Sequence, residues 1–233
     1  MKNSVLNRYS CRKFSGEKID DKIVREIIDL TRLSPSSCGL EPWIFLVISK
    51  DDEIKNLGEI CNNQPQVSNC SHAVIIMARN DLKVGCDYLD KCVKRRANTP
   101  EKYENAIKYF NNKFKNLNAD EVMNYASKQC YIATANLVNL AQSFDVKSCI
   151  IAGFDKDKLN QFIKNYKFDE NIAKNLLANG KKLSKNGEVC EKESKDNFLD
   201  DRFAPILVVT LGKGEDIKFP HTRHALSDIL IWN

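Results

Sequence analysis

The sequence predicts a globular protein that combines α-helices with short, buried β-strands. Apolar residues recur at helical spacing from Asp20 to Ser34 and again from Asp120 to Phe144. Short, almost wholly apolar runs cover residues 44–48, 73–77 and 205–211, which is typical of strands buried on both faces. The two kinds of pattern together predict a fold of mixed helix and strand content.

Composition indicates one domain spanning residues 1–233. Of the 233 residues, 42% are hydrophobic and 29% are charged, and no linker-like tract divides the chain. No apolar run approaches the roughly 20 residues of a membrane span. The first residues also lack the apolar core of a signal peptide. We therefore expect a cytoplasmic protein without a membrane partner.

The charge distribution does not favour a nucleic-acid partner. The net charge of +5 is mild for this length, and the densest basic cluster is Lys91 with Lys94, Arg95 and Arg96. On a helix, such a cluster is more typical of a solvated face than of a nucleic-acid surface. Nucleic acid is therefore not an expected partner.

Nine cysteines are scattered along the chain without a C-x-x-C pair. Their odd number, in a chain without an export signal, predicts reduced thiols and neither a disulfide framework nor a metal site. Most are expected to be small buried hydrophobes. Cys190, in a polar segment, is the thiol that we expect to be most exposed.

A polar loop links the first long helical pattern to the strand at 44–48. It reads Ser34-Pro35-Ser36-Ser37-Cys38-Gly39-Leu40-Glu41-Pro42-Trp43. Its composition leaves little room for regular hydrogen bonding, so backbone N–H groups and hydroxyls could meet a flat, polar-edged ligand. The alternative interpretation is an ordinary helix-to-strand connection made of turn residues.

Two further stretches could contact a ligand. Arg8, Ser10 and Arg12 alternate along an extended segment, so all three project to one side and could grip a phosphate. An exposed polar strand edge is the alternative. Further along, the apolar run from residue 146 ends at Gly153, which permits a close approach of the backbone to a ligand. Asp155 is the predicted N-cap of the next helix.

These stretches together resemble the FMN-dependent nitroreductase family. The resemblance rests on Arg-x-Ser-x-Arg at residues 8–12, Pro-Ser-Ser at 35–37, Gly-Phe-Asp at 153–155 and His-Thr-Arg at 221–223. It covers most of the chain in the family's order. It implies an α+β fold in which helices flank a central mixed, mainly antiparallel sheet. It also implies a homodimer whose long central helix, about residues 120–144, is buried.

The resemblance also implies which residues hold FMN. Arg8, Ser10 and Arg12 would hold the phosphate and ribityl chain, and His221 and Arg223 would close around the phosphate, with His221 in place of a more usual Lys. The remaining contacts would be made with the ring system, by Pro35, Ser36, Ser37, Gly39, Asn63, Gln66, Ala152 and Gly153. Ala152 departs from the family, because many members have Glu at this position.

Two regions are expected to vary within the family. Residues 82–116 have a helical pattern broken at Thr99-Pro100, and correspond to a variable cap over the site. Residues 164–197 are rich in lysine and asparagine and are expected to form a polar insertion.

The activity implied by the resemblance is a ping-pong hydride transfer through flavin N5. NADH or NADPH would reduce the flavin, and a nitroaromatic, quinone or flavin would then be reduced as a small-molecule acceptor. The cofactor carries this chemistry, so no catalytic side chain is assigned. One alternative is a specialised relative, namely a dehalogenase, an enoate reductase or a flavin reductase. The other is an FMN-binding storage or sensing protein with little turnover.

Overall fold

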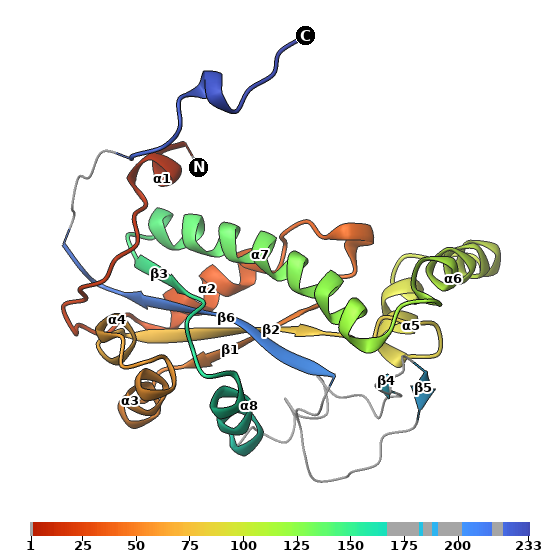
Figure 1. Ribbon diagram of the computed structural model, residues 1–233, viewed down its shortest axis with the longest axis horizontal. Helices are drawn as coiled ribbons and strands as arrows, with labels where there is room; N and C mark the ends of the chain where they lie inside the picture. The colour runs from red at the N-terminus through yellow and green to blue at the C-terminus, as the bar shows by residue number, and fades with distance from the viewer. Residues whose placement is uncertain (1, 167–181, 184–187, 191–201, 216–220) are drawn as a thin grey trace.

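The computed structural model describes residues 2–166, 182–183, 188–190, 202–215 and 221–233 (Figure 1). The helices among them are α1 (Lys2–Asn7), α2 (Asp21–Thr31), α3 (Asp51–Ile60), α4 (Pro65–Ser68), α5 (Asp87–Lys94), α6 (Pro100–Phe114), α7 (Ala119–Ser143) and α8 (Lys156–Asn165), with 3-10 turns η1 (Ser37–Gly39) and η2 (Leu226–Asp228). The strands are β1 (Trp43–Ile48), β2 (His72–Arg79), β3 (Lys147–Ile151), β4 (Lys182–Leu183), β5 (Val189–Cys190) and β6 (Phe203–Gly212).

Four strands form the central sheet in the order β1-β2-β6-β3. Every neighbouring pair is antiparallel; Phe45 of β1 lies opposite Ile76 of β2, and Val74 lies opposite Val209 of β6. A parallel contact comes from the N-terminal segment, where Ser10 forms an isolated bridge with Ser148. The α+β prediction is therefore confirmed, with a mainly antiparallel sheet.

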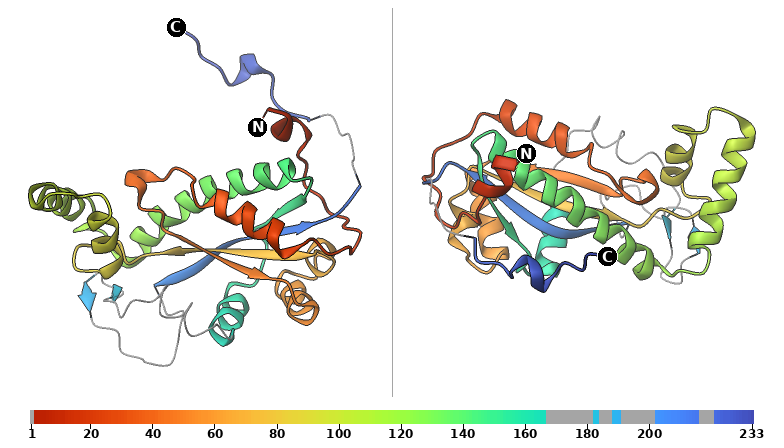
Figure 2. Two further views of the ribbon diagram at one scale, coloured as in Figure 1. Left: turned by 180° about the vertical axis from the view of Figure 1, so that it is seen from behind. Right: turned by 90° about the horizontal axis from the view of Figure 1, so that it is seen from above.

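Helices cover both faces of this sheet, with α2 and α7 on one face and α3, α4 and α8 on the other (Figures 1 and 2). Strand β2 is buried along its whole length, so both of its faces carry apolar side chains. Val74 and Ile76 join the core beneath α7, whereas Ile75 and Met77 join the core beneath α3 and α8. This alternation explains why the run reads as continuously apolar.

Helix α7 is buried on one side only within the single chain. Asn118 and Glu121 form a capping box at its start, and a row of small and apolar residues packs on the sheet. Its opposite side carries Tyr131 and Ile132, which are 54% and 41% exposed. An apolar face of α7 therefore remains open within one chain, and burial of that face in a dimer stays a prediction.

The other predicted elements are confirmed within narrow limits. Asp20 caps α2, because its side chain accepts from the Lys22 N–H, and Asp155 caps α8 in the same manner. Thr99 is the N-cap of α6, so the break in the helical pattern lies at Thr99-Pro100, where it was expected. Most of the predicted insertion at 164–197, including the side chain of Cys190, lies outside the described residues. No helix in the described part of the chain is long and apolar enough to cross a membrane.

Candidate functional site

The segment that carries Arg8, Ser10 and Arg12 runs alongside β3. The Cys11 N–H donates to the Ser148 carbonyl at 3.0 Å. Cys11 is fully buried, whereas Ser10 and Arg12 are exposed and Arg8 is half-buried. Anchoring of Cys11 in the core therefore turns Ser10 and Arg12 toward solvent, as the alternating pattern predicted.

The positive charges of Arg8 and Arg12 both act on the same thiol of β3. Burial raises the pKa of the Cys149 thiol, while the positive charges of Arg12 and Arg8 both act in the opposite direction. Both guanidinium groups are therefore close to one thiol of β3. Within the described ranges, neither arginine forms an ion pair with a carboxylate. Two such cations beside the Ser10 hydroxyl fit a phosphate dianion.

A tight turn follows the other end of β3. The Gln64 side-chain amide donates to the Gly153 carbonyl and to the Cys61 carbonyl, both at 2.9 Å. The Asp155 N–H donates to the Ile60 carbonyl at 3.0 Å, so the turn is tied to the end of α3. A Cβ built on Gly153 would lie 3.7 Å from Gln64 Nε2 and 3.8 Å from Asn62 Nδ2.

Gln64 and Asn62 were missed by the sequence reasoning, which selected Asn63 and Gln66 instead. Asn63 is exposed, and Gln66 is buried with its amide donating to Gln64 Oε1 at 2.9 Å. Gln66 thus contacts the Gly153 turn through Gln64. Asn62 and Asn63 both adopt left-handed backbone angles, with φ of 59° and 54°. The Asn-Asn pair was a usable signal for this turn, because asparagine tolerates that conformation.

The loop from Ser34 to Glu41 is held more tightly than its composition suggested. The Ser37 N–H donates to Gln129 Oε1 of α7 at 2.8 Å, and the Glu41 N–H donates to Ser36 Oγ at 2.9 Å. The Tyr125 hydroxyl donates to the Ser37 carbonyl at 3.3 Å. The expectation of free N–H groups and hydroxyls is therefore wrong for the Ser37 N–H and the Ser36 hydroxyl, which stabilise the loop itself.

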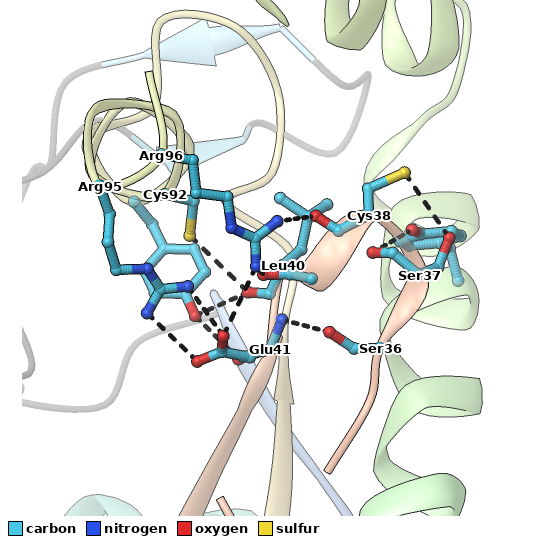
Figure 3. A network of polar contacts seen from close by, with 11 residues as sticks. Ser36, Ser37, Cys38, Leu40, Glu41, Cys92, Arg95 and Arg96 are labelled. Atoms are coloured by element: carbon cyan, nitrogen blue, oxygen red, sulfur yellow. Dashed lines mark hydrogen bonds and ion pairs between the residues drawn. The ribbon is translucent and has the colours of Figure 1, made fainter. Parts of the chain in front are cut away.

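Residues just beyond the C-terminal end of α5 hold the same loop from the other side (Figure 3). Arg95 forms a paired contact with the Glu41 carboxylate, the shorter arm being 2.8 Å. Arg96 donates to the carbonyls of Cys38 and Gly39. Gly39 has φ of 54°, and a Cβ there would collide with the Arg96 guanidinium. The glycine thus serves both the backbone conformation and the approach of Arg96.

Within one chain, the loop packs against the middle of α7, whereas the arginine pair lies near the C-terminal end of this helix. Ser37 contacts α7 at Gln129, whereas Ser10 pairs with Ser148, which lies beyond the helix end at Ser143. The helix between Gln129 and Ser143 is about 21 Å long at 1.5 Å per residue. The structure therefore brings the predicted site residues together as two groups.

The C-terminal pair is placed beside the N-terminal helix only in part. His221 Nε2 donates to the Leu6 carbonyl at 2.8 Å, two residues before Arg8. Arg223 is exposed and donates to the carbonyl of its neighbour Thr222. His221 thus contacts the N-terminal helix two residues before Arg8. The hydrogen bond described for Arg223 is with its own neighbour and not with the arginine pair.

Comparison with known proteins identifies the family and the fold. The sequence profile of the Nitroreductase family matches residues 5–172. A Bacillus subtilis protein named "Putative NAD(P)H nitroreductase YfkO" is 32% identical over 246 residues, covering 100% of this chain and 98% of that protein.

Solved structures share the same fold. A nitroreductase family protein from Streptococcus pneumoniae superposes with a TM-score of 0.73 at 20% identity, covering 100% of this chain and 99% of the other. A structure from Exiguobacterium sibiricum, described as a putative nitroreductase in complex with FMN, gives a TM-score of 0.71 at 18% identity, with 100% and 96% coverage. The chain belongs to the nitroreductase family, and its fold is the α+β fold of that family.

Proposed function

We propose that this protein is an FMN-dependent oxidoreductase that uses NADH or NADPH to reduce nitroaromatics, quinones or flavins. The observation that carries the proposal is the placement of Arg8, Ser10 and Arg12 at one end of β3 and of the Gly153 turn at the other. The two ends are about 16 Å apart at 3.3 Å per residue. That span is comparable with an extended flavin mononucleotide.

The chain's own residues would bind and orient this cofactor. Arg8, Ser10 and Arg12 would bind the phosphate, with His221 and Arg223 completing the basic surroundings. The ring system would be bound by the backbone of Ala152 and Gly153, by the amides of Asn63 and Gln66, and by Asn62 and Gln64, which we add because they adjoin Gly153.

We further propose that each site needs two chains. The Pro35–Gly39 loop lies about 21 Å along α7 from the end of the helix near the arginine pair. This exceeds the span of about 16 Å from the arginine pair to the Gly153 turn. The loop of one chain would therefore not reach the ring system of an FMN whose phosphate is bound by the arginines of the same chain. The open apolar face of α7 supplies a surface for a homodimer. The C-terminal segment offers further exposed apolar residues to a partner chain, namely Leu226, Ile229, Ile231 and Trp232.

In this mechanism, the flavin supplies hydride transfer at N5 and the protein supplies position and charge. Ala152 and Gly153 are exposed and small, so they leave space for a nicotinamide and afterwards for an acceptor. The Gln64 contact holds the Gly153 backbone in place. No side chain is required as a nucleophile or a general base, and a shared binding space gives ping-pong kinetics.

A storage or sensing protein is the second candidate, and Ala152 is the observation that favours it. Many family members have Glu at this position, and the structure provides only an exposed methyl group there. A missing carboxylate would remove one polar contact for nicotinamide while leaving backbone contacts to FMN intact. Steady-state oxidation of NADH and NADPH with a quinone or a nitrofuran separates the two candidates, because a storage protein shows negligible turnover with every acceptor.

The first test is the visible absorption spectrum of the purified protein, before and after anaerobic addition of NADPH or NADH. A yellow protein that bleaches supports flavin binding and hydride acceptance. A colourless protein that fails to take up added FMN would overturn the assignment of Arg8, Ser10 and Arg12. We also propose a cytoplasmic location, because the eight cysteines with described side chains are all free thiols.

A further inference from the structure

Cys38 differs from the other cysteines whose surroundings are described. Seven of those eight thiols are buried, and Cys38 is half-buried at the surface of the Ser34–Glu41 loop. Burial raises the pKa of Cys61, Cys70 and Cys130 to about 12, as expected for inert core thiols. Cys38 is therefore the described thiol that combines access to solvent with a polar environment.

The backbone explains how this side chain leaves the core. Cys38 adopts φ of 54° within η1, a left-handed conformation that a cysteine rarely adopts. The Arg96 contacts to the Cys38 and Gly39 carbonyls hold this conformation. The thiol consequently points away from Arg96 and toward Ser37 (Figure 3).

Three polar groups meet the sulfur there. The Tyr109 hydroxyl oxygen lies 3.4 Å from Cys38 Sγ, Lys113 Nζ lies 3.6 Å away, and Ser37 Oγ lies 3.9 Å away. Tyr109 and Lys113 both come from α6, where they are four residues apart and so share a face. The cluster therefore connects α6 to the Ser34–Glu41 loop through the Cys38 thiol.

Lys113 has no competing anion in this cluster. Its ammonium lies 4.9 Å from the centre of the Tyr125 ring and 3.4 Å from Ser37 Oγ, and it forms no carboxylate ion pair within the described ranges. Burial opposes ionisation of the thiol, but hydrogen bonds from Tyr109 and Ser37 and the charge of Lys113 lower the Cys38 pKa.

A small cavity of about 140 Å³ next to Cys38 is lined by Leu40, Cys92 and Arg96, but not by Ser37, Tyr109 or Lys113, which surround the thiol. The sulfur lies with those three groups, so we expect a reagent to reach it from the solvent side, where Cys38 is half-buried. The ammonium beside the sulfur favours a reagent that carries a carbonyl oxygen.

We propose that Cys38 is a nucleophilic thiolate that forms covalent adducts with quinones and other α,β-unsaturated carbonyl compounds. In this step, a sulfur lone pair forms a bond with the β-carbon of the alkene, and the π electrons move onto the carbonyl oxygen. The Lys113 ammonium is placed to donate a proton to that oxygen and is reprotonated by water. The product contains all atoms of both reactants, so no external oxidant or reductant is needed.

The test measures labelling by limiting N-ethylmaleimide and by 1,4-benzoquinone, with peptide mapping, in protein carrying Cys190→Ser. That substitution removes the one thiol whose surroundings are not described. We expect one adduct, on the peptide containing Cys38, and its loss in the additional variant Cys38→Ser. Rapid labelling of another cysteine, or labelling of Cys38 only after denaturation, would overturn the proposal.

Charge variants test the cluster itself. Lys113→Met removes the ammonium, Lys113→Arg keeps a positive charge, and Lys108→Met removes an exposed charge elsewhere on α6. Removing the cation should raise the Cys38 pKa. A rise of one unit in the Cys38 pKa reduces the thiolate fraction about tenfold at neutral pH. The more basic thiolate is also a better nucleophile, so the labelling rate falls by only about threefold.

The pH profile supplies the decisive comparison. The midpoint of labelling should move to higher pH in Lys113→Met and stay near the original value in Lys113→Arg and Lys108→Met. Equal midpoints in Lys113→Met and Lys108→Met would show that Lys113 does not activate the thiol. Labelling needs no flavin, so its failure is separable from a failure of the proposed function. If the proposed oxidoreductase function holds, the adduct on Cys38 should also block turnover.

Discussion

At the scale of single residues, the arginine pair beside β3 is the proposed binding site for the FMN phosphate. Both arginines influence the same thiol of β3, and neither has a carboxylate partner among the described residues. Arg12 is the more exposed of the two, so removal of its side chain disturbs the fold least. Hydrogen bonds to a charged group contribute about 1.5–3 kcal/mol.

We therefore expect Arg12→Met to weaken FMN binding on the order of tenfold or more, measured by flavin fluorescence titration. Lys13→Met is the matched control, because Lys13 is also exposed and follows on the opposite side of the extended segment. The control removes the same charge and should leave FMN affinity within about twofold. Equal losses in the two variants would indicate a general charge effect and would contradict specific phosphate binding by Arg12.

At the scale of single elements, α7 connects the sheet to the proposed partner chain. One side of the helix is packed into the core, while Tyr131 and Ile132 are exposed on the other. A buried charge without a partner is strongly destabilising at an interface. The open side is therefore the place where one substitution should separate the two chains.

We expect Ile132→Glu to convert the protein from dimer to monomer and to abolish stable FMN binding, because each site draws on both chains. Sedimentation velocity and the flavin content of the purified protein measure the two effects. Asn111→Glu is the matched control, since it adds the same charge on the exposed surface of α6 and should retain the dimer. A monomeric variant that still holds FMN with unchanged affinity would contradict the two-chain site.

At the scale of the whole molecule, ligand binding should be visible as stability. Arg8 and Arg12 repel each other when no anion is present, and a bound phosphate reverses that repulsion. A ligand that binds only the folded state stabilises it by about 2.7 kcal/mol at one hundred times its dissociation constant. Thermal unfolding with added flavin therefore reports on the arginine pair.

We expect FMN to raise the unfolding temperature more than the same concentration of riboflavin does, because riboflavin lacks the phosphate. In Arg12→Met, the difference between the two ligands should become smaller. Differential scanning fluorimetry of apoprotein measures both shifts. Indistinguishable shifts for FMN and riboflavin in the unsubstituted protein would place the phosphate away from the arginines.

The sequence by itself determined most of the elements and the direction in which Ser10 and Arg12 project. The helix at Asp21–Thr31, the strand at His72–Arg79, the break at Thr99-Pro100 and the cap Asp155 follow from local rules of periodicity and hydrogen bonding. The outward projection of Ser10 and Arg12 also follows from strand alternation. These features depend on neighbours within a few residues, which is why a single sequence reveals them.

The tertiary structure alone decided which distant residues meet. Gln64 reaches Gly153, Gln129 takes the Ser37 N–H, and Lys113 lies beside Cys38, each through contacts between segments far apart in the chain. The distance between the Ser34–Glu41 loop and the arginine pair also follows from the length and position of α7. Packing of separate helices onto one sheet sets these distances, and no local pattern in the sequence records them.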